Sequence, residues 1–273
     1  MSTITNRKRA LSDAITVDAW HQTFDGERRT ATLHAHVAFG EGRLGHEPGM
    51  KISFRLGLRR AEVVLVIPEA EGLSVDKASV NRKSTGSNFK GRTVRQHRDA
   101  SSFGAKLSFM LGLDSARAGL GLHMEKSRRR ELKREMETLA DAPMKISQSM
   151  TTDDEYRWVI ETQTAAGLEG SPWEADAEPR LTLIDNNAGK PRRIEPSVRI
   201  EVRCRREDLL ISDIEITDKS LLKDLPEHKT SRRNEVAAEC YIRDELLRHG
   251  LGGGDLSNRF AEITLLSVVA EQS

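Results

Sequence analysis

Short runs in which apolar and polar residues alternate fill most of this 273-residue chain, and they limit its fold more than any other feature. Successive side chains of a β-strand point to opposite faces, so alternation predicts a strand with one face in a core. Residues 61–67 are instead apolar at every position except Glu62 and end at Pro68, which predicts a strand buried on both faces. The predicted strands cover residues 14–20, 30–39, 51–58, 61–67, 156–162, 180–184, 198–204, 209–216 and 260–269.

Two stretches resemble each other beyond this shared alternation. Residues 47–55 (EPGMKISFR) align with residues 195–203 (EPSVRIEVR), and after a two-residue gap residues 59–65 align with residues 205–211. Chance similarity between two amphipathic hairpins and a true internal duplication explain this equally well. A duplication predicts two related β-units, each resembling a sandwich.

Two segments have helical patterns. Residues 124–140 are dominated by charge and have only a narrow apolar stripe, which predicts an exposed helix. Residues 234–249 form the second helix, which ends at Gly250 and is expected to dock on a sheet. Its predicted apolar face consists of Val236, Ala237, Cys240, Tyr241, Leu246 and Leu247.

The predicted fold is therefore mainly β (α+β). It has two related β-sandwich-like units, an exposed charged helix between them and a docked C-terminal helix. We expect an N-terminal β-unit over residues 1–100, a Gly/Leu-rich segment with the charged helix over 101–142, and a C-terminal β-unit over 143–273 that contains the helix 234–249.

Composition narrows the class of protein. Lys plus Arg (43) nearly balance Asp plus Glu (42), which argues against a protein that coats nucleic acid with its whole surface. Two cysteines make neither a disulfide framework nor a zinc knuckle, so a reducing compartment is expected. No run of about 18 apolar residues predicts a transmembrane helix, and the N-terminus has no signal-peptide pattern. Together these features predict a cytoplasmic protein.

Residues 82–98 contain six cations, one histidine and no acidic residue, among many Ser, Gly and Asn residues. This composition predicts a long loop that could bind the phosphates of nucleic acid or of an anionic membrane. A solvated basic loop without a ligand is the alternative. The candidate anion-binding residues are Arg82, Lys83, Lys90, Arg92, Arg95 and Arg98, with Arg128, Arg129 and Arg130 of the charged helix.

Residues 105–124 alternate over two arms, each about as long as a membrane-crossing β-strand of roughly 9–11 residues. The pattern allows a membrane-inserting hairpin, a soluble hairpin or a helix.

His34 and His36 lie two residues apart in a predicted strand, so their imidazoles share one face about 7 Å apart. They could share a metal ion if Glu41 or His46 were a third ligand. Exposed strand histidines without a metal are the alternative.

Asp213 and Glu215, with Asp218 nearby, fit the polar face of a half-exposed strand better than a metal-dependent nuclease site. The Gly-rich residues 250–254 follow a helix and do not open one, so they predict a helix end and a turn in place of a phosphate loop.

We find no pattern typical of an enzyme and none typical of a cofactor site. The sequence favours a non-enzymatic binding or assembly protein, a subunit of a cytoplasmic complex of the bacterial type. Its expected partner is another protein or a second copy of the chain. The alternatives are a membrane-active, pore-forming β-protein that uses residues 105–124, and a nucleic-acid-binding protein that uses residues 82–98.

Overall fold

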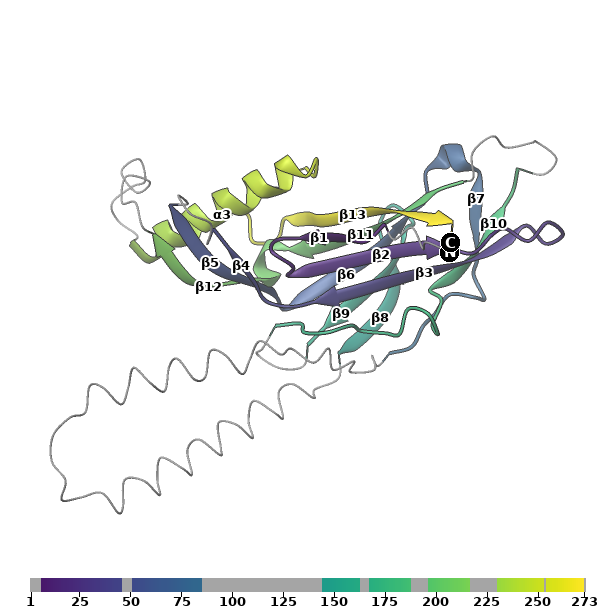
Figure 1. Ribbon diagram of the computed structural model, residues 1–273, viewed down its shortest axis with the longest axis horizontal. Coiled ribbons are helices and arrows are strands. Elements are labelled where there is room, and N and C mark those ends of the chain that lie inside the picture. The colour runs from purple at the N-terminus through teal and green to yellow at the C-terminus, as the bar shows by residue number, and fades with distance from the viewer. Residues whose placement is uncertain are drawn as a thin grey trace, which may run out of the picture. The chain divides into compact units, whose positions relative to one another are not determined.

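The structure is a computed structural model that describes residues 6–45, 51–84, 144–162, 167–187, 196–216, 230–252 and 254–272. These residues belong to a compact unit made of residues 1–89 and 143–273. The unit is mostly β, and its described part has one α-helix (Figure 1). The strands are β1 (Lys8–Ala10), β2 (Ile15–His21), β3 (Thr30–Phe39), β4 (Gly42–Leu44), β5 (Ile52–Leu58), β6 (Arg60–Val66), β7 (Leu73–Asp76), β8 (Lys145–Met150), β9 (Tyr156–Glu161), β10 (Leu181–Asp185), β11 (Val198–Arg205), β12 (Leu209–Ile216) and β13 (Glu262–Gln272).

Ten strands form one large, curled, mixed sheet. Along it the strands follow the order β7-β10-β3-β2-β13-β11-β6-β9-β8, and β1 pairs with β2 beside this path. Its described pairs are antiparallel except β13 and β2, which meet in parallel at Glu271 opposite Trp20 and Gln272 opposite His21. The sheet surrounds an apolar core that includes Trp158, Ile160 and Leu183, each fully buried.

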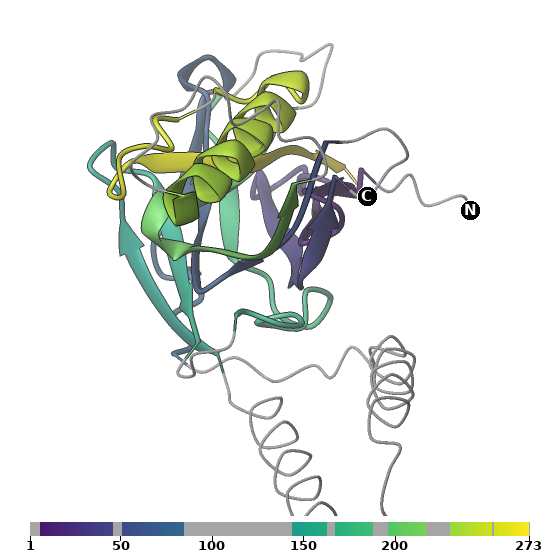
Figure 2. The same cartoon turned by 90° about the vertical axis from the view of Figure 1, so that its left-hand side faces the viewer.

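A small sheet of order β12-β5-β4 carries the helix. The chain passes from β5 to β6 through Arg59, and from β11 to β12 through a short 3-10 helix, η2 (Arg206–Asp208). The consecutive strands β5 and β6, and likewise β11 and β12, therefore connect the small sheet to the large one. Helix α3 (Thr230–Arg248) lies against β12 and β5 (Figure 2), and the ring of Tyr241 meets that of Phe54 edge-on at 5.7 Å between centroids.

All nine predicted strands are present, with ends that differ from the prediction by at most three residues. The residues Ala61–Leu65 of β6 are all buried, as the apolar run predicted. Strands β1, β4, β7 and β8 were not predicted. The first three have only three or four residues, too few to show a period of two. In β8 the buried Ile146 is followed by Ser and Gln, so the pattern resembles a polar loop.

The two sandwich-like units and the duplication are not confirmed. The two stretches that resemble each other pair with one another, because β5 bonds to β12 and β6 bonds to β11. Strands before residue 84 and after residue 144 alternate across the large sheet, as where β10 lies between β3 and β7. The predicted boundaries at residues 100 and 142, the charged helix 124–140 and the hairpin 105–124 lie outside the described residues.

The helix over residues 234–249 is confirmed, although it begins earlier, at Thr230. Its predicted apolar face is wrong in part, because Cys240 is exposed and Leu247 is 55% exposed. The stripe that faces the small sheet is Ala238, Ile242 and Leu246, all buried. The two stripes lie side by side on the helix, and both have the spacing of an apolar face, so the sequence pattern does not distinguish them.

Candidate functional site

Residues 79–84 link the two ends of the large sheet. They follow β7 at one end and reach β8 at the other, and they hydrogen bond to strands on both sides. The curled sheet is therefore closed by a segment that is not itself a strand, and we call residues 79–84 the closing segment. Its bonds run from Thr182 N–H to Ser79 Oγ (2.7 Å), Asn81 N–H to the Arg180 carbonyl (2.8 Å), Trp158 Nε1–H to the Asn81 carbonyl (2.8 Å) and Ile146 N–H to the Ser84 carbonyl (2.9 Å).

Two of the predicted anion-binding residues, Arg82 and Lys83, lie on this closing segment and are exposed. The Arg82 guanidinium donates to the backbone carbonyl of Lys77 at 3.1 Å. The Lys83 ammonium forms an ion pair with Glu178 at 2.6 Å, in which Lys83 is 61% exposed. The other predicted residues of this group lie outside the described part of the chain, so the structure brings together only these two.

A buried arginine lies beside the closing segment. Arg180 is 1% exposed, and its guanidinium donates to the backbone carbonyl of Glu178 at 2.9 Å and to its carboxylate at 3.3 Å. It also lies 4.1 Å from the centroid of the Trp173 ring. Burial lowers the pKa of Arg180 to about 10, against the opposing effect of Glu178. Sequence reasoning missed Trp173 and Glu178 because they come from a segment without regular structure, and it placed Arg180 in the predicted strand 180–184 without any sign of its burial.

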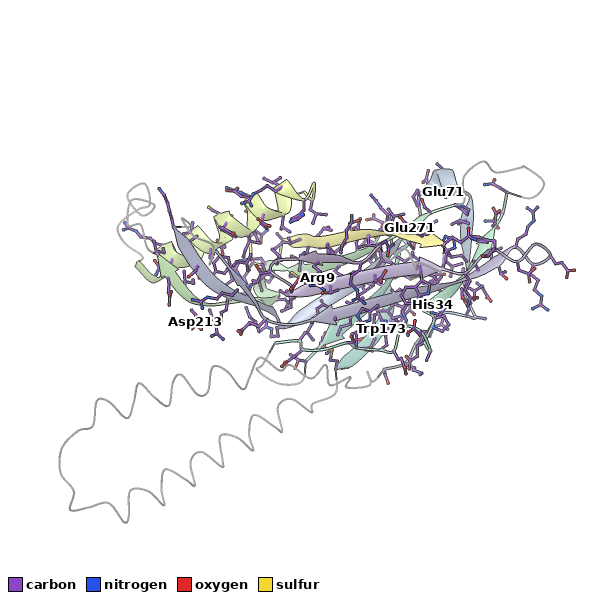
Figure 3. The ribbon with its side chains drawn as sticks, in the orientation of Figure 1. Arg9, His34, Glu71, Trp173, Asp213 and Glu271 are labelled. Atoms are coloured by element: carbon purple, nitrogen blue, oxygen red, sulfur yellow. The ribbon has the colours of Figure 1, made fainter. Side chains whose placement is uncertain are left out.

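His34, one of the two predicted metal ligands, already makes hydrogen bonds within the protein. His34 is buried, its Nδ1–H donates to the carbonyl of Ala175 at 2.7 Å, and its Nε2 accepts from the hydroxyl of Thr32 at 3.2 Å. The ring stacks on that of Trp20, with centroids 5.4 Å apart and planes 7° apart. Figure 3 labels His34 and Trp173, whose indole N–H donates to the Ala35 carbonyl at 2.6 Å. Both nitrogens of His34 therefore have partners within the protein.

The third ligand that the metal hypothesis needs is not found in the described part of the chain. Glu41 accepts a hydrogen bond from Arg55 at 2.8 Å, and His46 is not among the described residues. Across those described ranges, no three or more His, Cys, Asp or Glu side chains are arranged to hold a metal ion.

His36 lies opposite Asp18 in the pairing of β3 with β2. Burial lowers the pKa of His36, the nearby Arg7 lowers it further, and Asp18 and Asp176 oppose the change. The unfolded chain should therefore take up a proton before the folded chain does as pH falls through the ordinary range of histidine.

We expect the free energy of unfolding to fall as pH drops through this range, because protons then favour the unfolded chain. The His36→Gln variant should lose less stability than the wild type between pH 7.5 and pH 5.5, in urea titrations at both values. The Arg7→Gln variant should show an intermediate loss. Equal losses in the wild type and in His36→Gln would contradict the assignment.

The carboxylates Asp213 and Glu215 lie on the exposed face of β12, and each has a cationic partner. Asp213 pairs with Arg55 at 3.1 Å and Glu215 with Arg43 at 3.8 Å. Asp213 has a φ of 50° where the register of β12 shifts, so the strict alternation expected for this strand is interrupted there. Asp218 lies outside the described residues.

Neither a protein-family model nor a curated protein matches this chain. In the part of the chain that the structure describes, no helix is both long and apolar enough to cross a bilayer.

The buried charged and histidine side chains of the described residues all have polar partners within the chain. Arg206, for example, donates to Glu235 at 2.6 Å. None of these buried side chains is therefore an unpaired acid or base of the kind that marks many functional sites. Burial also raises the pKa of the Cys204 thiol, which keeps it protonated and unreactive. The buried set is Asp18, His21, His34, Glu62, Arg180, Glu201, Arg206 and Asp208.

Proposed function

We propose that this chain is a non-enzymatic binding or assembly protein, a subunit of a cytoplasmic complex, in which a closed β-body presents residues 85–143 to a protein partner. The observation that carries the proposal is the hydrogen bond from Ile146 N–H to the Ser84 carbonyl, at 2.9 Å. It joins Ser84, which directly precedes residues 85–143, to Ile146 of β8, shortly after them, so the described chain on the two sides of that stretch comes together at one place. The hydrogen bonds that close the sheet come from residues 79–84.

The distribution of residue types supports the same division. Within the β-body each buried charge has an oppositely charged partner in the chain, which suits a scaffold. The sequence between Ser84 and Met144 contains four of the six cations of residues 82–98, the Gly/Leu-rich stretch and the charged segment. A basic and charged composition of this kind suits recognition of a partner.

The test is to replace residues 85–143 with a short Gly-Ser linker. Because Ser84 and Ile146 are already in hydrogen-bond contact, we expect far-UV circular dichroism typical of a β-protein and a melting temperature within about 5 °C of the full chain. Purified full chain should bind its partner, identified by cross-linking in the native cell, at least about tenfold more tightly than the linker variant.

Three results would contradict the proposal. The linker variant could fail to fold, it could bind the partner as well as the full chain does, or the purified full chain could turn over nucleotides, nucleic acid or peptides. The double variant Arg43→Gln with Arg55→Gln is a matched control, since it removes surface charges far from residue 84 in the sequence and should leave partner binding unchanged.

Nucleic acid is a second candidate partner, favoured by the exposure of Arg82 and Lys83 at the start of the basic stretch. If all six cations of residues 82–98 contact phosphates, the logarithm of the binding constant should fall with the logarithm of salt concentration with a slope of about −5. Fluorescence anisotropy with duplex DNA and single-stranded RNA measures this slope. Serine at all six positions should abolish it, and anionic vesicles in a leakage assay test the membrane alternative.

A further inference from the structure

Three consecutive residues between β1 and β2 adopt a strained backbone. Leu11, Ser12 and Asp13 have φ values of 54°, 55° and 66°, in the left-handed region that disfavours L-amino acids other than Asn, Asp and Gly. Leu11 is nonetheless buried at 3% exposure, and a Cβ atom at Gly42 would clash with the Leu11 carbonyl oxygen. Burial and close packing therefore hold a turn that the backbone alone would not choose.

Strand β1, which this turn holds in place, is short and shallow. It pairs with β2 through three residues only, and two of these, Lys8 and Arg9, are exposed. Polar side chains add to its attachment, because the Lys8 ammonium donates to the Ser267 carbonyl at 3.2 Å and the Asn6 amide donates to the Ala19 carbonyl at 2.8 Å. Of its three residues only Ala10 is buried, so the strand itself exposes little apolar surface when it detaches from the sheet.

We propose that two copies of this chain exchange β1, so that residues 6–10 of each copy pair with β2 of the other. The occupant that fits the vacated edge of β2 is the identical strand of a second copy, which makes the same three pairs and the same side-chain bonds. Exchange straightens the turn at residues 11–13, so the dimer is favoured by release of the strain that only the closed chain carries.

The register supports a continuous intermolecular ribbon. In the closed chain Lys8 lies opposite Val17, and Ala10 lies opposite Ile15. Continuing this register between two copies places Leu11 opposite Ala14 of the partner subunit. In the closed chain the Ala14 carbonyl already accepts from Gly40 N–H at 3.0 Å, while Ala14 N–H reaches back to the Leu11 carbonyl at 3.2 Å. Exchange would turn the hydrogen bond from Ala14 N–H to the Leu11 carbonyl into a bond between subunits.

Cysteine cross-linking between two different variants tests the exchange directly. Arg9 lies opposite Thr16, and the Cα atoms of opposed antiparallel residues are about 4.5–5.5 Å apart, within disulfide reach. Full-length Arg9→Cys and Thr16→Cys proteins, both with Cys240→Ser, are mixed at high concentration, incubated and oxidised. We expect a disulfide-linked dimer on a non-reducing gel, and light scattering should show a dimer for the wild type.

A monomeric mass at all concentrations overturns the proposal. So does a dimer whose mixed variants stay uncross-linked, because it must form through another surface. The double variant Arg9→Cys with Thr16→Cys shows whether β1 and β2 pair within one chain, since it then gives an oxidised monomer.

Relief of the strain provides a second measurement. The full-length variant Ser12→Gly with Asp13→Gly removes the penalty of the closed turn, so its dimer dissociation constant should rise by at least about tenfold. Arg29→Gly is the matched control, because Arg29 also has a positive φ, 55°, but lies in another turn. It should leave the dissociation constant unchanged. Equal dissociation constants for the wild type and the double glycine variant would overturn the role of strain.

Discussion

Replacing Trp173 with alanine is expected to lower the free energy of unfolding by about 3–5 kcal/mol. Trp173 is 1% exposed, and its indole N–H donates to the carbonyl of Ala35. Its ring also covers the guanidinium of Arg180 at 4.1 Å. The substitution therefore leaves a cavity, an unpaired buried carbonyl and a buried cation that has lost its aromatic neighbour. Urea unfolding followed by tryptophan fluorescence and circular dichroism measures the loss.

Trp173→Phe is the matched control for this prediction. It keeps a ring for Arg180 and most of the buried volume but removes the donor to Ala35, so we expect a smaller loss of about 1–3 kcal/mol. A loss below about 1 kcal/mol for Trp173→Ala would mean that the side chain is not part of the core.

The second large effect is expected for Arg206→Met, which should lower the free energy of unfolding by about 2–4 kcal/mol. Arg206 is 8% exposed and ties η2 to helix α3, because its guanidinium donates to Glu239 at 2.7 Å and to Glu235 at 2.6 Å. Removing it leaves the carboxylate of Glu239, only 15% exposed, without its cation. The range is set below that of a fully buried pair because Glu235 is 49% exposed.

Hydrogen exchange locates this effect, since amides of α3 should lose protection before those of the large sheet. Adding Glu239→Gln to Arg206→Met should restore part of the stability, because the orphaned charge is then gone. Arg259→Met is the control at the same η2 turn: Arg259 pairs with Glu207 but is 69% exposed, and we expect no measurable change. Equal stability of Arg206→Met and wild type would show that the pair does not hold the helix.

The strands could be predicted because alternation is a local signal. Residues 30–39 alternate and form β3 with those bounds, and the other eight predicted strands are also present. The face of α3 could not be predicted in the same way. Leu246 and Leu247 are equally apolar neighbours, and only the position of the small sheet buries the first and exposes the second.

The candidate site shows the same limit. Composition drew attention to Arg82 and Lys83, but nothing local marks Arg180 as a buried cation. It lies against the ring of Trp173, and Trp173 in turn donates to the carbonyl of Ala35 in β3, which is far away in the chain. His34 likewise suggested a metal ligand in the sequence, and its carbonyl partner Ala175 is far away in the chain.

The sequence by itself determined that this chain is mainly β, where nine of its strands lie and that one helix follows residue 230, because periodicity is set by neighbouring residues. Only the tertiary structure decided that the two similar stretches pair with one another, β5 with β12 and β6 with β11. It also decided that residues 79–84 close the sheet, that the buried charges are paired and that residues 11–13 hold a left-handed turn. Each of these depends on contacts between residues distant in the chain, which no local pattern records.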